Sequence, residues 1–175
     1  TFAQQASAAG TYVALGDSVA AGWGASDQAT KGYVGVLGAA LGVGTPFNFG
    51  VAAQTSTTLR GQQLTDALAK INDPSDTTLV TIDIGANDFY VEHCQAGWDT
   101  GCPLRANLAA TLDDLLNALA NDPGKETLAT MAYYNPYAGE GTQEERDWDT
   151  NLFGANGVLN ATDKGADVGV NDVIL

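Results

Sequence analysis

Short apolar runs rich in β-branched residues alternate along this chain with longer segments whose apolar residues recur at helical spacing. The short runs have the length of buried β-strands, and the longer segments have the periodicity of amphipathic helices. The pattern predicts strands at Thr11–Leu15, within Pro46–Val51, and at Thr77–Ile84, Thr127–Tyr134 and Ala166–Leu175. It predicts helices at Gly32–Val43, Ser56–Ile71, Pro103–Ala120, and from Thr142, where Thr142 and Glu145 form a capping box, to about Thr162.

Strands separated by amphipathic helices are typical of βαβ units, and right-handed crossovers place their helices on both faces of one parallel sheet. The predicted fold is therefore an α/β fold: a three-layer α/β/α, doubly wound, five-stranded parallel sheet of the flavodoxin-like kind. Residues 1–175 are expected to form one domain, because this length suits a single domain with a sizeable hydrophobic core. Ligands of such sheets bind at the carboxyl ends of the strands, so the residues that follow each strand are the first candidates for a site.

The composition limits the kinds of partner that the chain can bind. The chain has 21 acidic and 7 basic residues, and its net charge of −14 disfavours nucleic acid and anionic membrane surfaces, which require basic patches. No apolar run is long enough to cross a bilayer. Thr1–Gly10 lacks the basic start and apolar core of a signal peptide, and is compatible with a mature end left after processing.

Cys94 and Cys102 are the two cysteines, with seven residues between them. A disulfide across this short loop is the favoured interpretation, and it indicates a secreted protein. Two reduced, buried thiols are the alternative. No metal site is expected, because His93, Cys94 and Cys102 supply three zinc ligands without a paired-cysteine motif.

Three loops at predicted strand ends carry candidate chemistry. Ser18 follows the first strand in a turn that Gly16 permits, and its hydroxyl has the position of a nucleophile; a helix cap is the alternative. Asn87 follows the third strand and offers a side-chain amide to a developing oxyanion, or is a turn or capping asparagine. The loop Asn48–Thr55 follows the second strand and offers backbone N–H groups to the same place, or is an ordinary connection.

These three blocks together resemble the SGNH (GDSL) hydrolase superfamily of secreted bacterial esterases and lipases, in order and over nearly the whole chain. The resemblance implies that Ser18 in the block Gly16–Val19 is the nucleophile, and that Asn87 in the block Gly85–Asp88 is a side-chain donor of the oxyanion hole. In the second block the backbone donor falls on Ala53, where the family has a glycine, with Gly50 as the other candidate.

The family's last block, Asp-x-x-His, is absent from these 175 residues. His93 is the one histidine, and its place six residues after Asn87 does not favour a role as the base for Ser18. The expectation is a domain that lacks its last helix and catalytic histidine loop, with the base supplied from outside the chain, for example by a separate C-terminal polypeptide. Asp83, Asp88 and Glu92 are interpreted as structural or capping carboxylates.

The expected function is a serine esterase or lipase that acts on a small-molecule carboxylic ester: a lipid, a short acyl ester or an acetylated glycan. No cofactor is expected, because the glycine-rich turns lack both the phosphate-binding and the dinucleotide-binding patterns. A catalytically inactive lipid- or carbohydrate-binding module on the same fold, or an inactive fragment, is the alternative. Four aromatic residues are placed at the rim of the site, or else cap the core: Trp23, Phe89, Tyr90 and Trp98.

Overall fold

The computed structural model describes residues 10–73, 77–91, 94, 102–121, 127–131, 138–143 and 146. Its centre is a parallel sheet in the order β2-β1-β3-β4. The strands are β1 (Thr11–Gly16), β2 (Phe47–Asn48), β3 (Thr77–Asp83) and β4 (Thr127–Thr130). These four confirm the predicted strand positions and the α/β class. The predicted fifth strand, Ala166–Leu175, lies outside the described residues.

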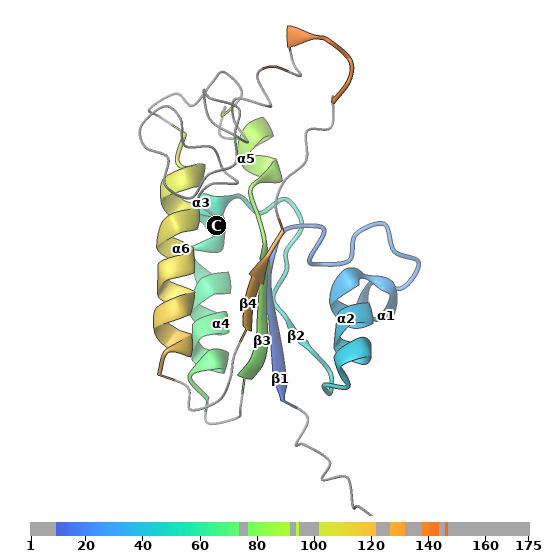
Figure 1. Cartoon of the computed structure of the whole chain (residues 1–175), viewed down its shortest axis with the longest axis vertical. Coiled ribbons are helices and arrows are strands. Elements are labelled where there is room, and N and C mark those ends of the chain that lie inside the picture. The colour runs from blue at the N-terminus through green and yellow to red at the C-terminus, as the bar shows by residue number, and fades with distance from the viewer. Residues whose placement is uncertain are drawn as a thin grey trace, which may run out of the picture.

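The sheet lies between two layers of helices (Figure 1). One face is covered by α3 (Ser56–Leu59), α4 (Gln62–Ile71) and α6 (Leu104–Leu119), and the other by α1 (Gln28–Lys31) and α2 (Tyr33–Leu41). The short helix α5 (Ala86–Val91) stands at the carboxyl end of β3. The described part of the chain therefore has the predicted three layers.

Alternation along β1 divides the core in two, because successive side chains of a strand point to opposite faces. Val13 and Leu15 pack with the α4 and α6 side, whereas Tyr12 and Ala14 pack with Val34 of α2. In β3, Val80 and Ile82 belong to the first side and Leu79 to the second. The same alternation carries Thr81 and Asp83 to the α2 face.

The strand order changes direction between β1 and β3. The chain leaves β1 for β2 at one side and then returns past β1 to pair β3 with it, in the register Gly16↔Asp83. The residues that follow β1 and β3 thus begin side by side, at the place where ligands bind in doubly wound sheets.

The helices differ from the sequence prediction in three respects. The predicted helix Ser56–Ile71 is two helices, which are separated at Arg60 and Gly61. Helices α1 and α5 were not predicted. Of the helix predicted after Thr142, the structure describes only the start, where the Arg146 N–H donates to the Thr142 carbonyl at 3.4 Å.

The predicted disulfide between Cys94 and Cys102 is present, with the two Cα atoms 5.1 Å apart. Cys94 is buried against the α4–α6 core, and Cys102 lies just before Pro103, the N-cap residue of α6. The bond therefore ties the chain after α5 to the start of α6.

Candidate active site

The Ser18 turn begins where β1 has no room for a side chain. Gly16 has φ of +144°, and a Cβ atom there would lie 2.2 Å from the Asp83 carbonyl oxygen. Only glycine fits so close an approach at such a φ. The next residue, Asp17, donates its N–H to that same Asp83 carbonyl at 3.0 Å, so the turn continues the β1–β3 contact.

The side chain of Asp17 organises the turn that presents Ser18. Its Oδ1 accepts the Val19 N–H at 3.0 Å, and its backbone carbonyl accepts the Ala21 N–H at 3.0 Å. Ser18 is half-buried and Val19 is exposed. Ser18 thus lies at the carboxyl end of the sheet, on a turn whose backbone is hydrogen-bonded before and after it, as the positioning of a nucleophile requires.

Asn87 lies at the carboxyl end of β3, in the first turn of α5. Its Nδ2 donates to the Gln54 carbonyl at 2.8 Å and to Asp17 Oδ2 at 3.3 Å. One amide therefore joins the loop after β2 to the turn after β1. Asn87 is inside a helix rather than in a turn before one, which the sequence did not predict.

The loop after β2 is held against the Ser18 turn by its own polar groups. Asn48 Nδ2 donates to the Ala20 carbonyl at 2.7 Å, and the Val51 N–H donates to the Gly16 carbonyl at 3.1 Å. A Cβ atom on Gly50 would lie 2.6 Å from the Ala21 nitrogen, so this glycine is needed for the close packing of the two loops.

The two candidate backbone donors of this loop differ. The Gly50 N–H is taken by Asn48 Oδ1 at 2.9 Å. Ala53 is exposed and has φ of +65°, and no described residue accepts a hydrogen bond from its N–H. Of the two, Ala53 has the N–H that is available to a ligand.

Two buried carboxyl groups lie behind the turn. Burial raises the pKa of Asp17, against the opposing effect of hydrogen bonds from the Val19 N–H and Ser18. Burial, and next the charge of Asp17, raise the pKa of Asp83 to about 6. Asp83 is 4% exposed, and among the described side-chain atoms its Oδ2 is buried without a hydrogen-bond partner.

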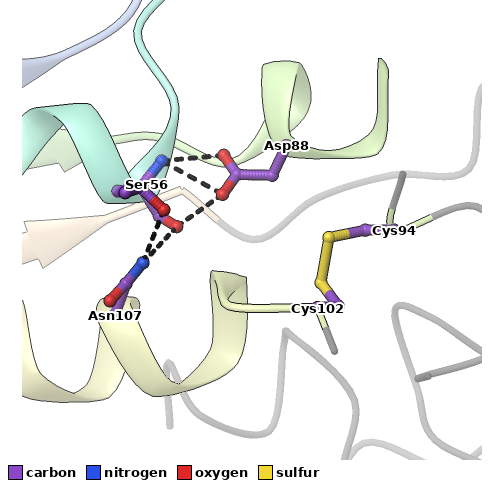
Figure 2. The surroundings of a disulfide bond; sticks show 6 residues. Ser56, Asp88, Cys94, Cys102 and Asn107 are labelled. Carbon is purple, nitrogen blue, oxygen red and sulfur yellow. Dashed lines mark hydrogen bonds between the residues drawn. A yellow bond between two sulfur atoms is a disulfide. The ribbon is translucent and has the colours of Figure 1, made fainter. Parts of the chain in front are cut away.

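Asp88 has a structural role, which confirms the capping interpretation. It is fully buried and accepts the Ser56 N–H at 3.1 and 2.8 Å, as well as the Ser56 hydroxyl (Figure 2). Asn107 of α6 adds a donor to Ser56 Oγ at 3.3 Å, close to the disulfide. The carboxylate thus satisfies the N-terminus of α3 and joins it to α5.

Gln63 supports the site and was missed by the sequence analysis. It is 5% exposed; its Nε2 donates to the Gly16 carbonyl at 3.1 Å, and its Oε1 accepts the Gly16 N–H at 2.9 Å. A signal was present, because this polar residue occupies the stripe of α4 that also holds Leu64 and Ala67. A polar residue in an apolar stripe indicates a buried partner.

The aromatic residues that the sequence places either at the rim of the site or over the core differ in exposure. Trp23 is 73% and Tyr90 is 59% exposed, whereas Phe89 is 1% exposed and belongs to the core, which is the second of the two interpretations. Trp98 lies outside the described residues. Beside the Ser18 turn, Ala21, Gln28, Val34 and Asn48 help to line a cavity of about 350 Å³.

Two further residues considered for the site, His93 and Glu92, lie outside the described residues, which contain no histidine. Within the described ranges, no group of three or more histidine, cysteine, aspartate or glutamate side chains is arranged to hold a metal ion. No helix in those ranges is long and apolar enough to span a membrane.

Solved structures with the same fold include several esterases. AlinE4, an SGNH-hydrolase family esterase, is 24% identical with a TM-score of 0.57, over 83% of this chain and 69% of its own. The acetylxylan esterase Axe2 from Geobacillus stearothermophilus is 22% identical with a TM-score of 0.53, over 82% and 70%. A Parabacteroides merdae protein described as a GDSL-like lipase is 19% identical with a TM-score of 0.53, over 80% of this chain and 66% of its own.

No curated protein matches the sequence. The model of the GDSL-like lipase/acylhydrolase family matches residues 14–173, which is nearly the whole chain. The resemblance carried by the three loops is thereby confirmed at the level of the family. The chain belongs to the GDSL-like lipase/acylhydrolase family, and is a carboxylic ester hydrolase of the SGNH type.

Proposed function

We propose that this chain hydrolyses carboxylic esters through an acyl-enzyme on Ser18. The observation that carries the proposal is the pair of hydrogen bonds from Asn87 Nδ2 to Asp17 Oδ2 and the Gln54 carbonyl, because they bring the three candidate loops to one point. Nucleophile and donors must converge in this way for acyl transfer.

The reaction has two steps. Ser18 Oγ attacks the ester carbonyl carbon while a general base takes the hydroxyl proton, and the tetrahedral intermediate expels the alcohol, which receives that proton. Water then attacks the acyl-serine, again with proton transfer to the base, and releases the acid and free Ser18. Negative charge develops on the carbonyl oxygen in both steps, so N–H donors aimed at it lower both barriers.

The proposed donors are the N–H groups of Ser18 and Ala53 and the side-chain amide of Asn87. In the free protein both amide hydrogens of Asn87 have acceptors. Its contact with Asp17 Oδ2, at 3.3 Å, is the longer one, so this N–H can be shared with an oxyanion, and the contact with Asp17 aims the amide before the substrate binds. Its 2.8 Å bond to the Gln54 carbonyl then keeps the amide in place.

The general base is proposed to come from residues beyond these 175, on the same or a separate polypeptide. The reason is compositional: His93 is the one histidine, and it follows Asn87 by six residues. A histidine within hydrogen-bond reach of Ser18 Oγ would take its proton and return it to the leaving group.

The substrate is proposed to be a lipid, a short acyl ester or an acetylated glycan. The exposed Trp23 and Tyr90 support contact with an apolar acyl group or a sugar ring. A panel of p-nitrophenyl acetate, p-nitrophenyl octanoate and acetylated xylo-oligosaccharides separates these classes. Because the chain has a disulfide, we also propose that it works outside the reducing cytoplasm.

The test of the function is intact-mass spectrometry after treatment with a fluorophosphonate probe. We expect one adduct on this chain that is absent in Ser18→Ala and kept in Ser26→Ala, an exposed serine that serves as the matched control. A second polypeptide that co-purifies with the chain would appear as a second mass and would be examined for the base. Labelling that persists in Ser18→Ala would reject Ser18 as the nucleophile.

An inactive binding module predicts a different result. It would show no adduct and no turnover on the ester panel, even with the base-containing segment present, and would still bind a lipid or glycan. Ester turnover that depends on Ser18 excludes this alternative.

A further inference from the structure

Among the described residues, Asp83 is a buried carboxyl near the site for which neither the catalytic scheme nor a hydrogen bond to its side chain provides a task. Its carbonyl oxygen holds the Asp17 N–H at 3.0 Å, but its own Oδ2 has no hydrogen-bond partner among the described residues. When the carboxyl is ionised, an oxygen in such a place loses its hydration and gains no hydrogen bond in return. A protonated carboxyl avoids most of that cost.

The neighbours of Asp83 make a second negative charge still less favourable. Asp17, which follows β1, is a buried carboxyl, and among the described residues Tyr33 of α2 and Tyr12 of β1 are the other titratable groups on this face. Burial raises the pKa of both phenols, so they remain neutral at pH 7. The described part of β4 carries no titratable side chain, and α4 contributes the neutral Gln63.

Asp17 has opposite requirements. Its Oδ1 accepts the Val19 N–H and its Oδ2 accepts from Asn87, so its negative charge strengthens both the Ser18 turn and the hold on the amide. A charge on Asp83 would oppose the charge on Asp17, as like charges in a shared site do. The two carboxyls therefore work best with one negative charge between them.

We propose that Asp83 is a positioning residue that retains a proton beside Asp17, so that Asp17 is the single ionised carboxylate that orients the Ser18 turn and the Asn87 amide. Asp83 acts through Asp17 and does not touch the reacting atoms. Loss of its proton in weakly acidic to neutral solution would loosen the Asp17–Asn87 contact.

The sign of the effect on stability follows from the pKa of Asp83, which is raised from 3.8 to about 6 in the folded protein. Below pH 3.8 both the folded and the unfolded chain hold the proton, and the stabilisation is complete. Between pH 3.8 and about 6 the unfolded chain releases it while the folded chain retains it, so stability falls as pH rises. Above about pH 6 this contribution is lost.

The first experiment is a ¹³C NMR titration of the aspartate carboxyl carbons in the wild-type 175-residue protein. We expect the pKa of Asp83 to lie well above the ordinary aspartate value of 3.8, and the side-chain amide signals of Asn87 to move over the same pH interval. Titration of Asp83 at the ordinary aspartate value overturns the proposal. This measurement requires neither activity nor a substitution.

The second experiment uses Asp83→Asn, which is neutral at every pH, with Asp66→Asn as the matched exposed control. We expect Asp83→Asn to remove the movement of the Asn87 amide signals and to flatten the fall of the urea midpoint between pH 4 and 6, and Asp66→Asn to do neither. Asn87 signals that still move with pH in Asp83→Asn overturn the link through Asp17.

The third readout rests on the proposed function. The rate of fluorophosphonate labelling at Ser18, expressed as the ratio of Asp83→Asn to wild type, is expected to rise about threefold or more between pH 5 and 7. A flat ratio contradicts the positioning role. Absence of labelling in every variant at every pH would instead count against the esterase, while the NMR titration still decides the state of Asp83.

Discussion

At the junction of β1 and β3, single residues can hardly change their side chain or backbone conformation. Gly16 approaches the Asp83 carbonyl so closely that a methyl group cannot be placed, and Gln63 occupies both polar groups of its backbone. Ser18 follows two residues later. The geometry of the nucleophile is therefore set by backbone contacts that precede it in the chain.

Gly16→Ala is expected to be severely destabilising, by about 3–5 kcal/mol, since it combines a backbone clash with a left-handed φ. Gly24→Ala is the matched control. It also has a positive φ, of +85°, but open space around the position, and should cost about 1–2 kcal/mol. Urea unfolding followed by circular dichroism measures both. Equal losses in the two variants would show that the clash is relieved by a backbone shift.

Part of the candidate site could be predicted at this scale. Ser18, Asn87 and the loop with Ala53 were recognised because each follows a strand, and the carboxyl ends of parallel strands meet at one edge. The partners of Asp17 and Gln63 could not be predicted, because the Asn87 side chain and the Gly16 backbone that they bond are distant in sequence, although the polar Gln63 in an apolar stripe signalled a buried partner. Rim and core both remained open for Phe89 because α5 was not foreseen, and that helix turns Phe89 into the core.

Among the helices described, α4 holds the end of β1 through a side chain. Its Gln63 side chain forms two hydrogen bonds to Gly16, whereas the adjacent Gln62 points to solvent and contacts Asp66. Neighbouring glutamines on one helix thus have different tasks, which offers an internal control.

Gln63→Ala is expected to lower the free energy of unfolding by about 2–3 kcal/mol, because it leaves a buried N–H with no partner and creates a small cavity. Gln62→Ala should change it by less than about 0.5 kcal/mol, as an exposed substitution on a helix does. Denaturant midpoints give the stability of each. Fluorophosphonate labelling of Gln63→Ala at low temperature, where it is folded, should also be slower. A loss of stability shared by both variants would indicate a general effect on α4.

The elements that the sequence predicted most closely are those with a long hydrophobic pattern, such as β1, β3 and α6. Helices α1 and α5 have 4 and 6 residues and are too short to establish a period. The sequence did not predict the break between α3 and α4, because the apolar pattern continues across it. It allows Arg60 to bond Thr111 and Asp114 of α6 at 3.0 Å, a tertiary contact that no local pattern records.

At the scale of the whole molecule, the net charge of −14 opposes compaction. Salt screens this repulsion, since the Debye length falls from about 30 Å at 10 mM to about 3 Å at 1 M. The free energy of unfolding at pH 7, measured by urea denaturation, is therefore expected to rise with NaCl, by on the order of 1 kcal/mol between about 10 mM and 0.5 M.

The control for this effect is the same titration near pH 4, where about half of the carboxylates are protonated and the response to NaCl should shrink. An equal response at both pH values would attribute the stabilisation to general salting-out rather than to charge repulsion.

The position of β1 in the middle of the sheet also determines when the molecule can be assembled during its synthesis. Gly16 pairs with Asp83, which is 67 residues further along, while Val13 pairs with Phe47 after a much shorter interval. A ribosome that adds about 5–20 residues per second leaves β1 without its main partner for several seconds. During that time the nascent chain holds an apolar strand with one short neighbour, so this segment is where a chaperone would be expected to bind first.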